Sequence, residues 1–307
     1  MITGTIAVCT RDRAPTLRQC LASLATQVAE PGQLEVLVVD NGSTDATDAV
    51  LREWAAGGEG RRHVHHPDVG LSSARNAALA ATDADVVIFT DDDALTPPTW
   101  ARAHLAAYAD PTVVAAGGPV GLTWPAGRPA WIHDDVVQWF SALDLGDEPG
   151  PFPTEHGPYG TNMSVRRRAA LAAGGYDVWL GRVGHRLISG EEPDLTRRLR
   201  AAGGRVVYVP EAAVVQQVLP ERLERRWLLR RGFAQGVTNA RLDARRHHRT
   251  RREGLAEAAE QLRRTTELIA RRRDAGRDDL ATTVVALAHA GAALDHARAS
   301  LGRRGRA

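Results

Sequence analysis

The order of apolar runs and helix-like stretches near the start of the chain is the feature that most restricts its fold. Strand-like runs, TGTIAVCT, LEVLVVD and DVVIFT, are separated by stretches whose apolar residues recur at helical spacing. Strands that alternate with helices predict a parallel sheet covered by helices on both faces. Ligands bind such sheets at the carboxyl ends of the strands, so we expect the loops after Thr10, Asp40 and Thr90 to share one crevice.

The last of these runs ends in three consecutive carboxylates, Asp91, Asp92 and Asp93. Adjacent negative charges repel one another, so the folded protein must offset that repulsion. One explanation is an acidic turn that caps the next helix, because helix N-termini favour negative charge. A cap needs fewer carboxylates than this, which favours a role in binding a ligand.

Composition limits the remaining classes of function. The 307-residue chain has a net charge of +2, which argues against nucleic acid as a partner. The chain contains no lysine, which excludes Schiff-base chemistry and the lysine-dependent phosphate loop. The N-terminus lacks the order of a signal peptide, and no apolar run reaches the roughly 18 residues that span a bilayer. We therefore expect a cytoplasmic protein and leave peripheral membrane contact open.

The motifs along residues 4 to 240 occur in an order that resembles the inverting family-2 glycosyltransferases. The matching segments are CTRDR, VVDNGSTD, GLSSARNAAL, FTDDDA, GTNMSVRR, GEEPDLTRRLRAAGGRVVYVPEA and ERLERRWLLRRGFAQG. The resemblance implies an α/β fold of the GT-A (Rossmann-like) type, with a mixed, mainly parallel sheet flanked by helices. It also implies a glycosyltransferase domain at 1–240, divided into a nucleotide-binding half at 1–118 and an acceptor-binding half at 119–240. A C-terminal helical extension is expected at 241–307.

The resemblance assigns the crevice to a nucleotide-diphosphate sugar, with UDP favoured by its frequency in the family. Asp40 matches the acid that accepts a hydrogen bond from the base, although an Asx turn in DNGSTD is equally compatible. Arg75 suits a base or phosphate contact, and a solvated helix arginine is the alternative. The residues assigned to the donor in this way are Thr10, Arg11, Arg13, Asp40, Arg75, Asp91, Asp92, Thr161 and Asn162.

The diphosphate also implies a divalent cation, Mg²⁺ or Mn²⁺, because these hard ions prefer oxygen ligands. The resemblance makes Asp93 the first metal ligand and Asp91 the second. Where the family usually has a metal-binding histidine, this chain has Gln216, and a glutamine carbonyl is an uncommon ligand. The metal is therefore a weaker expectation than the donor.

An inverting transfer needs one carboxylate to take the proton of the attacking hydroxyl. In the family this base is the second acid of a Glu-Asp pair at the start of a helix. Here the pair is Glu191-Glu192, so the resemblance assigns Glu192 as the base and leaves Glu191 as the second candidate. The alternative is a helix start enriched in acids for the helix dipole, which Pro193 in the first turn fits equally well.

The acceptor-side candidates lie in or near a long stretch at 124–160 that is rich in proline, glycine and aromatic residues. They are Trp124, Trp131, Tyr159 and, in a glycine-hinged loop further along, His185. Aromatic faces stack on sugars, but a lid that packs on its own domain explains the aromatic residues as well. The residues do not identify the hydroxyl-bearing acceptor.

The arginine-rich tail and two other functions complete the set of expectations. The stretch 250–301 predicts two amphipathic helices, and we favour packing within the chain or a homodimer through them. A catalytically silent sugar-nucleotide-binding or scaffold protein remains an alternative, supported by Gln216. A sugar-phosphate nucleotidyltransferase shares the sheet order, but such enzymes use an early glycine-rich loop with a lysine that this chain lacks.

Overall fold

The computed structural model describes residues 2–27, 33–153, 157–184, 186–247, 250–275 and 280–301. The chain forms two compact units. Unit 1 consists of Met1–Gly127, Ser141–Trp179 and Glu191–Leu219, and unit 2 consists of Arg128–Phe140, Leu180–Gly190 and Pro220–Ala307.

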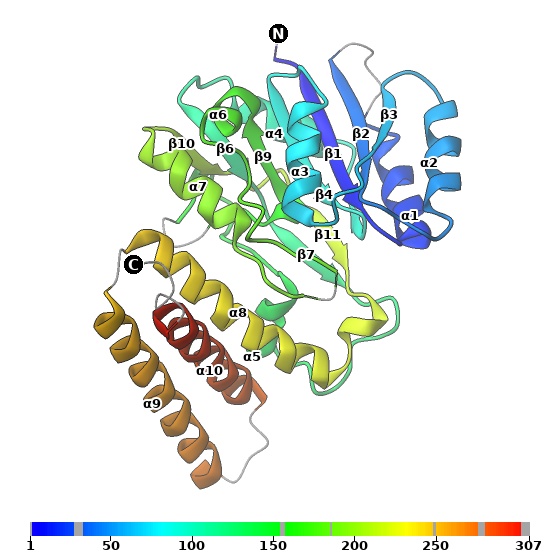
Figure 1. Ribbon diagram of the computed structural model, residues 1–307. Coiled ribbons are helices and arrows are strands. Elements are labelled where there is room, and N and C mark those ends of the chain that lie inside the picture. The colour runs from blue at the N-terminus through cyan, green and yellow to red at the C-terminus, as the bar shows by residue number, and fades with distance from the viewer. Residues whose placement is uncertain are drawn as a thin grey trace. The chain divides into compact units, whose positions relative to one another are not determined.

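A mixed sheet of eight strands forms the centre of unit 1 (Figure 1). The strand order is β3 (Arg61–His65), β2 (Leu34–Asp40), β1 (Gly4–Thr10), β4 (Val86–Asp91), β9 (Met163–Arg166), β6 (Val113–Gly117), β10 (Arg205–Tyr208) and β8 (Gly150–Pro151). Strands β1 to β4 are mutually parallel, β10 is parallel to β6, and β9 is antiparallel to both of its neighbours. This arrangement confirms the predicted mixed, mainly parallel sheet.

Alternating residues of the central strands pack on opposite faces of this sheet. Ile6 and Val8 of β1 belong to one buried cluster, while Ala7 belongs to the other. A parallel sheet that is buried on both faces needs near-continuous apolar strands, which explains the unbroken apolar runs in the sequence. The helices of unit 1 are α1 (Ala14–Leu24), α2 (Thr47–Ala56), α3 (Leu71–Ala80), α4 (Trp100–Ala107), α6 (Arg167–Ala172) and α7 (Glu191–Ala201).

A second, three-stranded sheet lies beside the carboxylate triplet. It contains β5 (Ala94–Leu95), β11 (Val214–Gln217) and β7 (Val120–Thr123), with β11 in the middle. Strand β11 runs antiparallel to β5, so that Gln216 lies opposite Ala94, directly after the triplet. Gln216 is therefore placed next to Asp93 by strand pairing alone.

Unit 2 is mainly helical. It contains α5 (Asp134–Val137), the 3₁₀ turns η1 (Gln138–Phe140) and η3 (Pro220–Arg222), and the long helices α8 (Arg225–Arg246), α9 (Arg251–Ala275) and α10 (Leu280–Leu301). The stretch 124–160, expected as a long loop, thus holds α5, η1 and β8. Helix α8 runs through residue 240, where the sequence placed a domain boundary. No helix in the described part of the chain is long and apolar enough to cross a membrane.

Helix α10 packs against both α8 and α9 (Figure 1). The two helices expected over 250–301 are α9 and α10, but only α9 has the expected alternation of charged and apolar residues. A Cβ atom at Gly236 of α8 would overlap the Ala288 carbonyl, and one at Gly291 of α10 would overlap that of Phe233. Small residues on α10 therefore let its backbone approach α8 closely.

Candidate active site

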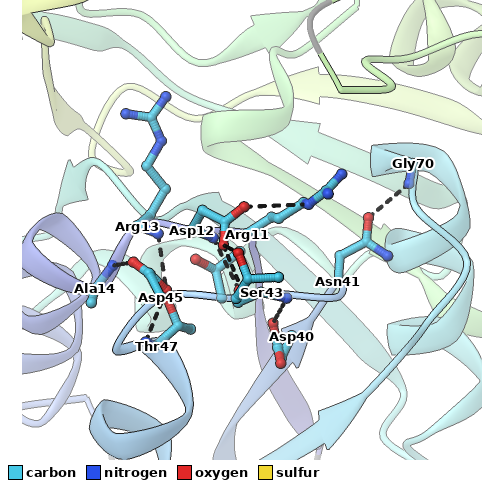
Figure 2. Close-up of polar contacts among 12 residues, drawn as sticks. Arg11, Asp12, Arg13, Ala14, Asp40, Asn41, Ser43, Asp45, Thr47 and Gly70 are labelled. Atoms are coloured by element: carbon cyan, nitrogen blue, oxygen red, sulfur yellow. Dashed lines mark hydrogen bonds and ion pairs between the residues drawn. The ribbon is translucent and has the colours of Figure 1, made fainter.

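The loops after β1 and β2 are joined by side-chain hydrogen bonds (Figure 2). Asp12 accepts hydrogen bonds from the Thr44 backbone N–H at 2.6 Å and from its hydroxyl at 3.1 Å. Asp45 accepts one from the Ala14 N–H at the start of α1. Arg11 and Arg13 extend from this braced loop in different directions (Figure 2), and Arg11 Nε lies 3.6 Å from Asp12 Oδ2. These hydrogen bonds therefore fix the loop backbone from which the Arg11 and Arg13 guanidinium groups extend.

Asp40 ends β2 as a nearly buried hydrogen-bond acceptor. The Ser43 N–H donates to its Oδ1 at 2.9 Å, and His65 Nδ1 lies 3.1 Å from its Oδ2. Burial raises the pKa of Asp40, but the hydrogen bonds from Ser43 and His65 outweigh burial, and the pKa lies below its usual value. The group is ionised at neutral pH, so it can accept a hydrogen bond from a ligand. The Asx turn proposed for DNGSTD is present as well, since Ser43 closes it.

Two members of the carboxylate triplet have separate protein partners. The Thr10 hydroxyl donates to Asp92 Oδ2 at 2.6 Å, and the Gln216 amide donates to Asp93 Oδ1 at 3.0 Å. Burial and then the charge of Asp93 raise the pKa of Asp92 to about 7, although the Thr10 hydrogen bond lowers it. A proton on Asp92 near neutral pH reduces the repulsion within the triplet. Asp91 pairs instead with Arg75 of α3.

The oxygen atoms around the triplet suit a hard cation. Asp91 is 30% exposed at its side chain, and the Gln216 Oε1 atom is buried with no hydrogen-bond partner among the described residues. Unpartnered buried polar atoms are rare, and this one is a neutral oxygen next to the Asp93 carboxylate. Carboxylate and amide oxygens are ligands that Mg²⁺ and Mn²⁺ accept. The described residues nevertheless contain no cluster of three or more His, Cys, Asp or Glu side chains that could hold a metal ion.

A single buried guanidinium connects the triplet with the acidic pair of α7. Arg75 Nη2 lies 3.7 Å from Asp91 Oδ1, and Arg75 Nη1 lies 2.9 Å from both Glu191 Oε1 and Glu192 Oε1. Arg75 is only 2% exposed, so the alternative of a solvated helix arginine is wrong. Burial alone would lower the pKa of Arg75, but Glu192 and Glu191, followed by Tyr176 and Asp91, raise it well above its usual value. The two acidic clusters predicted to share a site are therefore in contact with the same side chain.

The two glutamates differ in their access to solvent. The Glu191 side chain is 2% exposed and the Glu192 side chain is 14% exposed. The Gly160 N–H donates to Glu192 Oε1 at 3.1 Å, so this oxygen has two donors, counting Arg75. No hydrogen bond from the described residues reaches Glu192 Oε2. Of the pair, Glu192 is the more exposed to solvent.

Gly160 is a site residue that the sequence analysis did not single out. A Cβ atom at this position would overlap Arg75 Nη2 and Glu192 Oε1. The only signal in the sequence is a glycine directly before the Thr161-Asn162 dipeptide. Glycine can occur at a position for many different reasons, so the role of Gly160 could not be predicted without knowing these contacts.

Asn162, expected on the donor side, is fully buried in a hydrogen-bond network. Its Oδ1 accepts from Trp100 Nε1 and His104 Nε2, each at 2.9 Å, and its Nδ2 donates to the carbonyls of Pro119 and Ala212. The amide has no hydrogen-bonding capacity left for a sugar. We interpret Asn162 as a structural residue beneath the site. The neighbouring Thr161 differs, because its buried Oγ1 has no hydrogen-bond partner among the described residues.

The aromatic acceptor-side candidates belong to both units. Tyr159 is 36% exposed and directly precedes Gly160, while Trp124 follows β7 and is half-buried. Trp131 belongs to unit 2, where the Arg225 guanidinium lies over its ring at 6.0 Å. His185 lies outside the described residues. Of the four, Tyr159 is the one that the chain itself ties to the acidic pair.

Comparison with known proteins agrees with this fold. A mannosyltransferase from Pyrobaculum calidifontis, solved with GDP-mannose and Mn²⁺, superposes on 99% of this chain and 75% of its own length with a TM-score of 0.58 and 22% identity. A glucosyl-dolichyl phosphate glucuronosyltransferase from Haloferax volcanii is 29% identical over 78% of this chain and 76% of the relative. The succinoglycan biosynthesis protein ExoM from Rhizobium meliloti is 31% identical over 79% of this chain and 76% of the relative.

The fold and these relatives define a glycosyltransferase of the GT-A type. The family model described as glycosyl transferase family 2 matches residues 5–172, which is more than half of the chain. The chain therefore belongs to glycosyl transferase family 2, and the predicted enzyme class and fold are confirmed.

Proposed function

We propose that this enzyme transfers a sugar, with inversion, from a nucleotide-diphosphate sugar to a hydroxyl acceptor. The observation that carries the proposal is the convergence of Asp91 and Glu192 on Arg75. An acid on the donor side and an acid that can take a proton then belong to one site, as a single displacement requires.

The proposed reaction forms one bond and breaks one bond at the anomeric carbon. The acceptor oxygen forms a bond to the anomeric carbon from one face, and its proton passes to Glu192 Oε2. The bond between the anomeric carbon and the diphosphate oxygen breaks on the opposite face, and the electron pair leaves with the diphosphate. Because the attack and the departure occur on opposite faces, the configuration of the anomeric carbon inverts.

The donor is proposed to bind along the carboxyl ends of β1, β2 and β4. Asp40 is ionised and held by Ser43, so it can accept an N–H of the base, and UDP is the first nucleotide to test. The mannosyltransferase structure contains GDP-mannose, and a structure of GalNAc-T7 with a TM-score of 0.57 and 16% identity contains UDP, so both bases belong in the panel. Thr161, whose hydroxyl has no hydrogen-bond partner in the described part of the chain, remains a proposed contact of the sugar.

A divalent cation is proposed to bind with the donor, and both of these solved structures contain Mn²⁺. Asp91, Asp93 and the Gln216 amide oxygen are the residues that would hold it. When bound, the cation would neutralise the negative charge of the diphosphate.

The proposed acceptor is a hydroxyl that reaches Glu192 past Tyr159, whose exposed ring can stack on a sugar. The two relatives described above carry names that refer to a dolichyl phosphate and to succinoglycan. A lipid-linked glycan and a growing polysaccharide are therefore the acceptor classes to test first.

The decisive experiment compares Glu192→Gln with Glu191→Gln. Thermal shift with nucleoside diphosphates and Mn²⁺ first identifies the base, because a ligand of the folded state raises the melting temperature. Donor turnover is then measured with each acceptor class. We expect Glu192→Gln to lower turnover by at least about 100-fold while nucleotide binding stays within about threefold, and Glu191→Gln to lower it less.

Other outcomes separate the alternatives. Full activity in Glu192→Gln, or a larger loss in Glu191→Gln, would contradict the assignment of the base. Nucleotide binding without turnover of any donor would instead support the catalytically silent binding protein.

A further inference from the structure

The two terminal nitrogens of Arg75 face acids with different proposed roles. Nη2 is directed to Asp91 on the donor side, and Nη1 is shared by Glu191 and Glu192. A base or phosphate contact, which the sequence suggested for Arg75, would require a guanidinium that reaches the ligand. In this site the guanidinium is 2% exposed and is surrounded by protein carboxylates.

The position of the guanidinium is set by residues that themselves have no contact with the proposed reaction. The Arg75 guanidinium lies 5.5 Å from the Tyr176 ring, and Tyr176 packs edge-on against Phe89. The next residue, Asn76, holds Tyr176 from both sides, because its amide donates to the Tyr176 carbonyl and accepts from the Tyr176 N–H, each at 2.8 Å. Asn76 thus holds Tyr176 in place beside the guanidinium of Arg75, which contacts the acidic pair.

The Glu192 carboxylate is held from one side only. Its Oε1 receives Arg75 Nη1 at 2.9 Å and the Gly160 N–H at 3.1 Å. Two donors on Oε1 restrict the rotation of the carboxylate and leave Oε2 without a hydrogen bond from the described residues. Such an arrangement is what a general base needs, since proton transfer depends on the position of the accepting atom.

We infer that Arg75 is a positioning residue for the base Glu192, and that it connects the base to the donor side through Asp91, without contacting the donor itself. This inference rests on the proposed function. It assigns the arginine of the SARN segment a role in the chemical step, where a direct donor ligand would act mainly in binding.

The test uses the full-length Arg75→Gln and Arg75→Lys variants. In Arg75→Gln we expect kcat to fall by about 30-fold or more, because Glu192 loses its charged partner. The dissociation constant for the nucleoside diphosphate should stay within about threefold of the wild-type value. Arg75→Lys keeps the charge but offers a single ammonium group, so it should recover part of the lost kcat.

The matched control is Arg198→Gln on the same helix as the acidic pair. Arg198 pairs with Asp194 at 2.8 Å and donates to the Gly175 carbonyl, so its loss disturbs α7 away from the two glutamates. A fall in kcat with Arg75→Gln that the control does not share supports the inference. Equal effects of the two variants would reduce Arg75 to a structural role and overturn it.

Two further results would also overturn the inference. One is a loss of nucleotide affinity of tenfold or more in Arg75→Gln with unchanged kcat at saturating donor, which is the behaviour of a direct donor ligand. The other is the same kcat in the lysine and glutamine variants. The failure of the inference and the failure of the proposed function can be distinguished. An active Glu192→Gln enzyme contradicts the proposed function. An inactive Glu192→Gln enzyme together with a fully active Arg75→Gln enzyme contradicts only the inference.

Arg75→Gln leaves the buried Glu191 carboxylate and the partly buried Glu192 carboxylate without their cation, and the variant can fail to fold. The double variant Arg75→Gln/Glu191→Gln removes one of those charges together with the arginine. Its kcat is compared with that of Glu191→Gln alone. A further loss of about 30-fold supports the inference, and equal values overturn it.

Discussion

Arg75 Nη1 lies 2.9 Å from Glu192 Oε1, although 117 positions separate the two residues in the chain. The contact joins the first turns of α3 to the first turn of α7. It places Glu192, the proposed base, against the Arg75 guanidinium, which also pairs with Asp91 at the end of β4. The arrangement links the donor-side and acceptor-side chemistry of the proposed reaction through one buried side chain.

Replacing Gly160 by alanine should disrupt this contact directly. The new methyl group would overlap Arg75 Nη2 and Glu192 Oε1, so one of them must move. We expect kcat to fall by at least about tenfold and the free energy of unfolding to fall by about 1–3 kcal/mol, as for an overpacked interior. Steady-state kinetics and denaturant unfolding measure the two effects.

The control for this substitution is Gly150→Ala in β8. A Cβ atom at Gly150 has no heavy atom within 4 Å, so both quantities should stay close to their wild-type values. Wild-type kcat in the Gly160→Ala enzyme would show that the acidic pair tolerates displacement and would contradict the prediction.

Substituting Gln216 by histidine should strengthen metal dependence. The Gln216 amide nitrogen donates to Asp93, and its oxygen has no hydrogen-bond partner among the described residues. An imidazole at this position would add a nitrogen ligand beside the carboxylate. We expect the Mn²⁺ concentration for half-maximal activity to fall by about tenfold. Gln217→His, one residue along the strand, serves as the control. An unchanged Mn²⁺ dependence in Gln216→His would mean that position 216 does not contribute to a metal site.

The buried His104 should make the protein sensitive to acid. Burial lowers the pKa of His104 to about 4, and the hydrogen bond to Asn162 opposes this only in part. Because the pKa is higher in the unfolded chain, the unfolded state binds the extra proton as the pH falls from about 6.5 to 4. The contribution of His104 to the free energy of unfolding is therefore fully present above about pH 6.5. This contribution is lost as the pH falls toward 4, which lowers the free energy of unfolding by up to about 3 kcal/mol.

His104→Gln should remove this part of the pH dependence. The free energy of unfolding is measured by denaturant titration at several pH values for both proteins. The variant can be less stable overall at pH 7, since it loses part of the network with Asn162 and Ser164. An identical slope between pH 6.5 and 4 in the two proteins would show that His104 is not the group responsible.

Close packing of α8 on α10 predicts an uneven response to alanine substitutions in unit 2. A Cβ atom at Gly236 would overlap the Ala288 backbone carbonyl, which cannot move without shifting α10. At Gly254 of α9 the atom that a Cβ would overlap is the Ser300 hydroxyl, which can rotate away. We expect Gly236→Ala to lower the free energy of unfolding by about 2 kcal/mol and Gly254→Ala to change it by less than about 1 kcal/mol. Equal effects would contradict the close approach of the two helices.

Much of unit 1 followed from local pattern. The runs around Ile6, Val38 and Ile88 are apolar on both faces and are separated by helical periodicity, which is sufficient to predict a parallel sheet. The clustering of polar residues at its carboxyl edge followed from the direction of the strands. The family resemblance pointed to the acidic pair on α7 and to Glu192 as the base, but it gave no physical reason for preferring Glu192 over Glu191.

The roles of Arg75, Gly160 and Asn162 required the tertiary structure. A guanidinium can bind a base, a phosphate or a carboxylate, and nothing near Arg75 in the sequence distinguishes these partners. Asn162 has the residue type of a sugar ligand, but its amide is used entirely by groups up to 62 positions away.

By itself, the sequence determined the strand and helix order, the edge of the sheet at which polar residues gather, and the residue types available there, because periodicity and chain direction are local properties. The tertiary structure decided three further points. It determined which carboxylates share the buried arginine, which of the two glutamates keeps an accessible oxygen, and which polar side chains are used up inside the protein. Those outcomes depend on distances between segments far apart in the chain, and such distances exist only once the core has packed.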